Sequence, residues 1–487
     1  MTNLNEIVLQ MNDERFNELC ESFKFTRADK YFILIKHIRQ NQDDENIIIR
    51  DLETSLGAYY ALRSRLHDKV KAFLLQKISE SKTGLYKHVT HLPELLYNTP
   101  KKTAISILQK LEADLLKSDM PYELSHVYSV LKKIYIHSPK YFHYSQRFNK
   151  TLAYTTSIHK AEELMIDFSK LIASHYVSRS KQLEELVVLI RSEIHNLSNL
   201  YASHRLKLYK LFIDISFALW LPDSIAISED DPVEDMLKEA DKILQSCPND
   251  VNYIHLDKIY YFLAFEYYHS LGIHKKAAVY FDSLKENLCS FLLYNFCTFP
   301  SKILISKIEH YTALNTPDLL EEEYLVLKKN YVPDPEDLPG YITYNKYKAI
   351  ICMITGKYVD AINYLAKTCD KINFRDYPHA EIEFKLMLTV CYSMVNGYEM
   401  SQQTLKGIMR RINEMEEGVY ENAKALAKLL HIQNSPNINS ARAQKVIMRQ
   451  RDKFIEKNKG IYKMFEGIDL SNDFIRKLTK FVKDPAE

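Results

Sequence analysis

Apolar side chains recur along this chain at intervals of three and four residues, the spacing that places them on one face of an α-helix. The clearest such face belongs to the segment 358–372 and consists of Tyr358, Ala361, Ile362, Leu365, Cys369 and Ile372. A second face just before it consists of Tyr347, Ile350, Ile351 and Ile354. Gly356 stands between the two, where the chain must reverse and a left-handed backbone is needed. The pattern predicts two antiparallel helices joined by a short turn.

The same pattern of helix, turn and helix recurs on both sides of this segment. Downstream it covers 377–415, with the pair Asn396 and Gly397 at the turn, and upstream it covers 260–284. Asn315 marks a further expected turn, because asparagine tolerates the left-handed conformation. The expected turns at Gly272, Asn315, Gly356 and Gly397 are then separated by 43, 41 and 41 residues. This steady period predicts an array of helical hairpins.

The order of side chains inside a unit points to a known type of repeat. A small residue precedes the glycine, a tyrosine follows two residues later and an alanine three residues after that, as in Ala349, Gly356, Tyr358 and Ala361. This order resembles that of tetratricopeptide-like repeats, with a longer period than their roughly 34 residues. The resemblance implies a right-handed α-α superhelix, a helical-repeat solenoid in which first helices line a groove and second helices brace it.

Glycine usage supports an all-α fold for the whole chain. The 487 residues include 10 glycines, and between Gly84 and Gly340 only Gly272 occurs, whereas strand-rich and nucleotide-binding folds need glycine at turns and phosphate loops. We expect three parts. Residues 1–230 form an irregular N-terminal helical region, 231–432 the hairpin array, and 433–487 basic C-terminal capping helices.

Charge and cysteine usage narrow the possible partners and the location. The chain has 65 basic and 63 acidic residues, so its net charge gives no general attraction to nucleic acid or to an anionic membrane. The most apolar stretch, Leu211–Leu221, is too short for a membrane span and contains Asp214. The seven cysteines form no C-x-x-C pair and lie mostly inside apolar helical patterns, which predicts reduced core residues and a cytoplasmic protein.

Recognisable catalytic chemistry is absent from the sequence. There is no glycine-rich phosphate loop, no G-x-S-x-G and no H-E-x-x-H. His88 and His91 are spaced to share a helix face as metal ligands, but no cysteine or carboxylate cluster completes a site, so we interpret them as surface histidines. We therefore expect no catalytic residues, no metal and no cofactor, and we do not expect an enzyme.

These observations favour a non-enzymatic scaffold or adaptor that binds a peptide or partner helix in the groove of the array. Candidate contact residues are polar positions of the first helices, namely Asn345, Lys346, Lys348 and Lys385. A groove filled by the chain's own C-terminal helix would indicate autoinhibition.

Two other functions stay open. The segment Ala441–Gly460 carries the strongest basic bias, and an RNA- or DNA-associated protein would use Arg442, Lys445, Arg449, Arg451 and Lys453. The alternative interpretation of this segment is a solvated capping helix, with Val446, Ile447 and Phe454 facing the array. The third function is a peptide- or metabolite-sensing regulator, because an N-terminal helical region followed by an array resembles the arrangement in peptide-sensing tetratricopeptide regulators.

Overall fold

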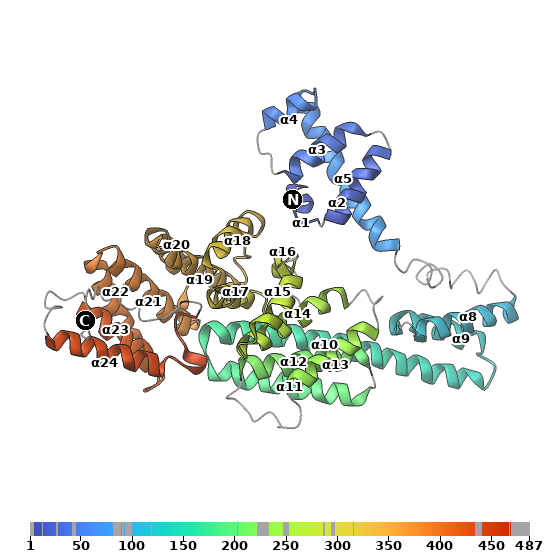
Figure 1. The fold of residues 1–487 in the computed structure, drawn as a ribbon. Coiled ribbons are helices and arrows are strands. Elements are labelled where there is room, and N and C mark those ends of the chain that lie inside the picture. The colour runs from blue at the N-terminus through green and yellow to red at the C-terminus, as the bar shows by residue number, and fades with distance from the viewer. Residues whose placement is uncertain are drawn as a thin grey trace. The chain divides into compact units, whose positions relative to one another are not determined.

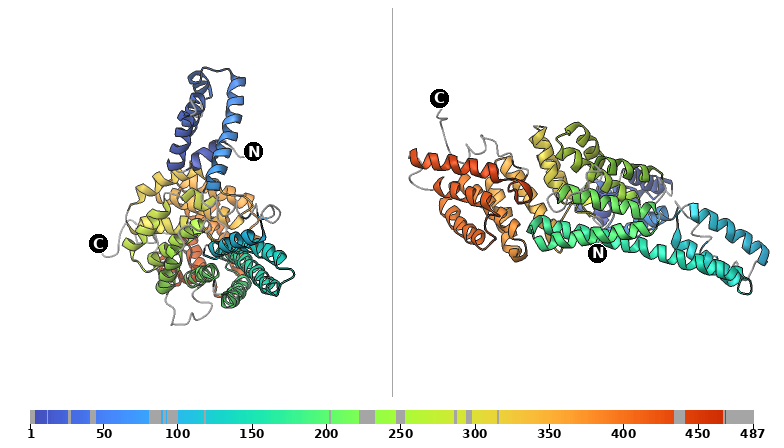
Figure 2. Two further views of the ribbon diagram at one scale, coloured as in Figure 1. Left: turned by 90° about the vertical axis from the view of Figure 1, so that its right-hand side faces the viewer. Right: turned by 90° about the horizontal axis from the view of Figure 1, so that it is seen from below.

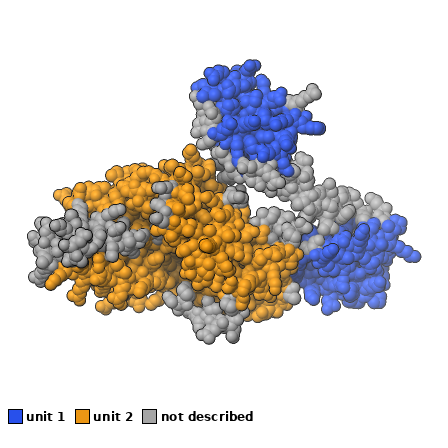
Figure 3. Space-filling model, in the orientation of Figure 1, with its two compact units in different colours: residues 1–159 blue, residues 160–487 orange. Residues whose placement is uncertain are grey.

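The computed structural model of the chain describes residues 4–11, 13–25, 28–40, 45–80, 89, 92, 100–117, 119–201, 203–221, 233–246, 253–285, 288–293, 298–314, 316–433, 441–466 and 468. Within these ranges every regular element is a helix, which confirms the prediction of an all-α protein (Figure 1). None of the helices in this part of the chain is long and apolar enough to cross a membrane. The chain divides into two compact units, residues 1–159 and 160–487 (Figure 3).

The first unit contains two separate hydrophobic cores. One is built from residues between Leu4 and Phe73 and the other from residues between Val89 and Phe148. Its helices are α1 (Leu4–Gln10), α2 (Asp13–Phe25), α3 (Asp29–Arg39), α4 (Glu45–Asp51), α5 (Leu56–Glu80), α8 (Lys101–Lys117), α9 (Pro121–Ile134) and the first part of α10 (Lys140–Ser178).

The second unit begins inside α10 and contains the predicted repeat region. The predicted boundary between the irregular N-terminal region and the hairpin array, near residue 230, lies inside this unit. That the regular repeats begin there stays a prediction. Its further helices are α11 (Lys181–Leu200), α12 (His204–Trp220), α13 (Val233–Ser246), α14 (Tyr253–Ser270), α15 (His274–Lys285), α16 (Leu288–Leu293), α17 (Lys302–Ala313), α18 (Pro317–Asn330), α19 (Leu338–Ile354), α20 (Tyr358–Lys371), η1 (Phe374–Asp376), α21 (Pro378–Met394), α22 (Tyr398–Asn413), α23 (Glu421–Gln433), α24 (Ala441–Lys457) and η2 (Gly460–Tyr462).

Successive helices of this unit pair as hairpins. The pairs α14 with α15, α19 with α20, α21 with α22 and α23 with α24 pack against each other, and α17 contacts α18. The first helices also contact one another in order, from α14 to α17, α19, α21 and α23. Figure 2 shows these hairpins from two further sides. The first helices thus form one continuous layer of the unit.

The hairpin turns lie at predicted glycine and asparagine positions. Gly272 and Gly356 have φ of +71° and +75°, the left-handed conformation predicted for the end of the first helix. At the third turn Asn396, with φ of +64°, is the left-handed residue, and Gly397 lies one position later at the start of α22. Asn315 lies outside the described residues. The turns share one hydrogen bond, from the N–H of residues 273, 357 and 397 to the C=O five residues earlier.

The second helices bury one face, whereas the first helices are buried on most sides. In α20 Ala361 and Leu365 are fully buried, as predicted from the apolar spacing. In α19 and α21 buried residues, polar as well as apolar, lie on nearly all sides of the helix. At the C-terminal end Ile447 and Phe454 of α24 are buried and Val446 is partly buried, and α24 packs against α23. Each such aliphatic or aromatic burial stabilises the fold by about 1.5–3 kcal/mol.

The described cysteines, Cys20, Cys289, Cys352, Cys369 and Cys391, are all free thiols. Burial raises the pKa of Cys352 and Cys369 to about 11 and that of Cys391 to about 12, so these side chains stay protonated and unreactive at neutral pH. They are the reduced core residues expected from the sequence. The cytoplasmic location stays a prediction.

Candidate functional site

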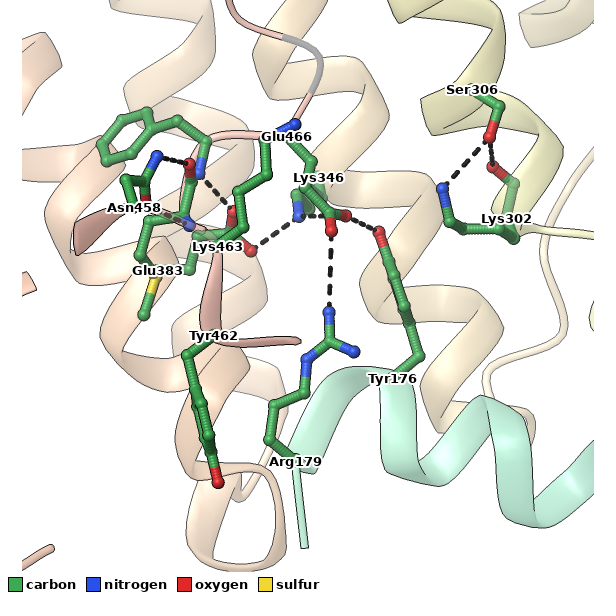
Figure 4. Close-up of polar contacts among 12 residues, drawn as sticks. Tyr176, Arg179, Lys302, Ser306, Lys346, Glu383, Asn458, Tyr462, Lys463 and Glu466 are labelled. Atoms are coloured by element: carbon green, nitrogen blue, oxygen red, sulfur yellow. Dashed lines mark hydrogen bonds and ion pairs between the residues drawn. The ribbon is translucent and has the colours of Figure 1, made fainter. Parts of the chain in front are cut away.

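The layer of first helices brings a group of buried charged side chains together (Figure 4). They come from the end of α10, from α14, α17, α19 and α21, and from the segment that follows α24. We call this group the inner charge cluster, and its members are Tyr176, Arg179, Glu266, Lys302, Lys346, Glu383 and Glu466. The Lys346 and Glu383 side chains are 5% and 3% exposed, so these charges are held away from solvent.

Glu466 lies at the centre of the cluster. Its carboxylate accepts a hydrogen bond from the Tyr176 hydroxyl, and its oxygens lie 3.6 Å from a guanidinium nitrogen of Arg179 and 3.6 Å from Lys346 Nζ. The Arg179 guanidinium also lies 4.9 Å from the centre of the Tyr176 ring, whose face attracts cations. One carboxylate therefore holds three side chains, two from the end of α10 and one from the middle of α19.

The charges of the cluster balance. Lys346 Nζ lies 2.7 Å from a Glu383 oxygen, and Lys302 Nζ lies 3.9 Å from one of Glu266. Three cations thus face three carboxylates. Because isolated buried charges are costly, this balance depends on every member, Glu466 included.

The local environment fixes the protonation states of the central groups. Burial alone would raise the pKa of Glu466, but Lys346, Lys302 and Arg179 lower it below its usual value. Burial and the neighbouring Glu466 raise the pKa of Tyr176 well above 10, so its hydroxyl keeps the proton that it donates. Burial would lower the pKa of Lys302, but Glu266 and Glu466 raise it. Glu466 and Lys302 are therefore charged at neutral pH, whereas Tyr176 is neutral.

The segment that carries Glu466 is folded back against the first helices. We call Asn458–Glu466 the inserted segment. The N–H of Met464 donates to Asn458 Oδ1 at 2.7 Å, and the N–H of Phe465 donates to Glu383 Oε1 at 2.8 Å. The side chains of Met464 and Phe465 are almost fully buried. Asn422 of α23 donates to Asn458 and to the C=O of Tyr462, at 3.0 and 2.8 Å.

Two residues at this site have strained backbones. Arg179 and Phe465 have φ of +57° and +61°, a region that non-glycine residues rarely adopt. Each such residue costs about 1–3 kcal/mol and persists only where the surroundings hold it, as they do at ligand clamps and switch regions. Phe465 directly precedes Glu466, and Arg179 lies 3.6 Å from the Glu466 carboxylate, so both strained residues lie at this carboxylate.

The four predicted partner-binding residues lie in different surroundings. Lys346 is a member of the inner charge cluster, and Asn345 is buried with its amide donating to the C=O of Tyr341 at 2.8 Å. Lys348 points to the other side of α19, because two residues correspond to about 200° of helix rotation, and lies 4.1 Å from the Tyr364 ring centre. Partner contact through these side chains stays a prediction.

Lys385, the fourth of these residues, lies in a separate cleft. Its amine lies 2.5 Å from Glu381 of the same helix. The cleft has a volume of about 450 Å³ and is lined by Asn373, Phe374, Arg375, Glu381, Lys385, Gly407, Arg410, Arg411 and Glu414. Four basic side chains and two acidic ones line it, so its lining carries a net positive charge. The four predicted residues therefore do not gather on one surface.

Two of the basic residues proposed above to contact nucleic acid instead form ion pairs within the chain. Lys445 and Arg449 are exposed, but Arg451 pairs with Asp452 at 2.9 Å and Lys453 pairs with Glu421 at 2.5 Å. The side chain of Arg442 lies outside the described ones. Phe454 is fully buried, so it has no free face on which a base could stack.

Little in the sequence indicates the central residues. Tyr176 and Arg179 end a long helix in a region without regular repeats, and Glu466 follows the basic helix in a segment expected to form a capping helix. The one available signal was the group of apolar and aromatic residues Ile461, Tyr462, Met464 and Phe465 directly after the basic helix. No protein-family model matches the chain, and no curated protein or solved structure is detectably similar to it. The tetratricopeptide resemblance therefore rests on the repeat residues alone.

Proposed function

We propose that the protein is a non-enzymatic interaction scaffold or adaptor. In this proposal its hairpins form an α-α superhelix, and the inner face of the first helices binds an extended, acidic peptide segment of a partner protein. The observation that supports it most strongly is the inserted segment, which places the Glu466 carboxylate between Tyr176, Arg179 and Lys346. In this proposal the inserted segment occupies the place on the first helices that a partner peptide would take.

The contacts of the inserted segment define the ligand chemistry that we propose. Met464 and Phe465 fill apolar space, the N–H of Phe465 donates to Glu383, and Glu466 neutralises the cations. A partner segment with two apolar residues followed by an acidic one would reproduce these three contacts. Without such a carboxylate the cluster would hold three cations against two acids, so its electrostatics favour an anionic side chain.

The inserted segment also competes with any external peptide. A covalently linked segment acts at an effective concentration on the order of millimolar, so an external ligand must displace it or await its release. In this proposal the inserted segment, rather than the C-terminal helix, autoinhibits the groove. This arrangement also favours a peptide-sensing regulator as the second candidate function, in which release of the inserted segment is the switch.

The first experiment removes the inserted segment from the proposed groove. A chain that ends at Lys457 keeps every helix through α24 and lacks the inserted segment. A fluorescent peptide with the sequence of residues 458–468 is titrated into this shortened chain and into the full chain, and binding is followed by anisotropy. We expect the peptide to bind the full chain far more weakly than the shortened chain, because the inserted segment of the full chain competes with it.

Matched controls test the proposed chemistry. A peptide with glutamine in place of Glu466 loses the charged hydrogen bond and is expected to bind about 10- to 100-fold more weakly. Lys346→Gln is expected to weaken binding, whereas Lys348→Gln, on the other side of the same helix, is not. Circular dichroism of each variant confirms folding. If the folded shortened chain binds the peptide no more tightly than the full chain does, the proposed groove is wrong.

A further inference from the structure

Three histidines meet where α14, α15 and α17 pack together. His269 lies in the last turn of α14, His274 begins α15 across the Gly272 turn, and His310 lies in α17 of the next hairpin. Each residue offers one ring nitrogen, and the three nitrogens lie within 4.8 Å of one another. The His269 ring centre is 6.1 Å from that of His274 and 6.0 Å from that of His310.

The Nδ1 atoms of these three rings are buried, and within the described part of the chain none of them has a hydrogen-bond partner. Buried polar atoms in folded proteins nearly always have a partner, so three such atoms in one cluster point to a ligand that the protein itself does not supply. His310 is only 2% exposed, so ordinary bulk solvent does not account for its nitrogen.

The surroundings of the cluster resemble those of a metal site. Glu309 places a carboxylate oxygen 3.6 Å from His269 Nε2, the outer partner that orients many metal-binding histidines and leaves the other nitrogen for the ion. Phe265 stacks against the His269 ring at 5.6 Å, and Phe281 lies 5.4 Å from the His310 ring. These aromatic rings restrict the access of water on two sides.

We propose that His269, His274 and His310 bind a divalent first-row transition metal ion, with Zn²⁺ as the most suitable one. Imidazole nitrogen is a preferred ligand of such ions. Zinc bonds of about 2.0–2.1 Å in a tetrahedron require nitrogens roughly 3.4 Å apart, so small rotations of the three side chains close the site. A water molecule would complete the coordination. The ion would tie the turn of one hairpin to the first helix of the next, which is a structural role.

The experiment uses the full chain, stripped of metal with a chelator and then titrated with ZnCl₂ by calorimetry. Co²⁺ is added in a second titration, because its visible absorption reports the number and type of its ligands. We expect one equivalent of Zn²⁺ per chain and a Co²⁺ spectrum of low coordination number with nitrogen ligands.

Single substitutions then assign the site. His274→Gln at the start of α15 is expected to weaken Zn²⁺ binding by more than about 100-fold, and Glu309→Gln by the about 10- to 100-fold typical of an outer partner. His137→Gln, at an exposed histidine in the other unit, is the matched control and is expected to change nothing. If metal-free His274→Gln does not fold, His269→Gln takes its place. The proposal is overturned if the full chain binds no stoichiometric Zn²⁺, or if the folded variants bind it as tightly as the unaltered chain.

Discussion

The most informative single substitution is Glu466→Gln, because it removes one charge from the inner charge cluster and changes the shape of the side chain very little. Lys346 keeps Glu383 at 2.7 Å and Lys302 keeps Glu266 at 3.9 Å. Arg179 loses the carboxylate that its guanidinium faces. The variant therefore leaves one buried positive charge without a partner.

The expected loss follows from the energetics of buried ion pairs. Removing one member of a buried pair typically destabilises a protein by about 3–5 kcal/mol, because the other charge stays desolvated. Two of the three cations here keep a second carboxylate, so we expect the lower end, about 3 kcal/mol in the free energy of unfolding of the second unit.

The chain supplies its own probe for this measurement. Trp220 is the one tryptophan of the sequence and shares a small cavity with Tyr176 and Lys302. Urea unfolding followed by Trp220 fluorescence therefore reports the second unit. Glu416→Gln is the matched control, since Glu416 pairs with Lys181 at 3.0 Å on the exposed surface, and its urea midpoint is expected to stay unchanged. If Glu466→Gln shifts the midpoint no more than Glu416→Gln does, the reasoning about the cluster is refuted.

Three further predictions concern the same unit. Tyr176→Phe removes the hydroxyl that donates to Glu466 and is expected to lower the free energy of unfolding by about 1.5–3 kcal/mol in the same urea assay; an unchanged value would contradict the bond. Burial, and then the nearby Arg179, lower the pKa of His175 from 6.5 to about 4, so its contribution is present above pH 6.5 and is lost as the pH falls toward 4. The loss between pH 7.5 and 4.5 is about 2.5 kcal/mol and should be visible in urea midpoints, but absent in His175→Gln. Gly356→Ala forces alanine into a φ of +75° and should destabilise the unit by about 1–2 kcal/mol, whereas Gly407→Ala, in the exposed face of α22, should stabilise it by roughly 1 kcal/mol. Thermal unfolding of the two variants tests these opposite signs.

The hairpins could be predicted because their signals are local. The apolar face of α20 and the left-handed Gly356 lie within a few residues of each other, so the sequence reports both helices and the turn between them. The choice between Asn396 and Gly397 at the third turn was not predictable, because both residues tolerate that conformation. The helices could therefore be predicted from the spacing of apolar residues along the sequence.

The inner charge cluster could not be predicted for a physical reason. Lys346 occupies a polar position in an apolar helix, which by itself indicates a solvent-facing side chain. It is buried because Glu383 comes from the next first helix and Glu466 from the far end of the chain. The three histidines pose the same problem, since His269 and His274 face each other across a turn but His310 comes from another hairpin. Pairing between distant segments leaves no periodic pattern in the sequence.

The central claim, that the inserted segment occupies a binding groove, is tested most directly by hydrogen exchange of two amides in the full chain. The N–H groups of Met464 and Phe465 donate to Asn458 and Glu383, so both should be protected in the free chain. An excess of the 458–468 peptide should displace the segment and remove this protection, whereas the peptide with glutamine at position 466 should not. Fast exchange in the free chain, or protection that persists at saturating peptide, would contradict the account.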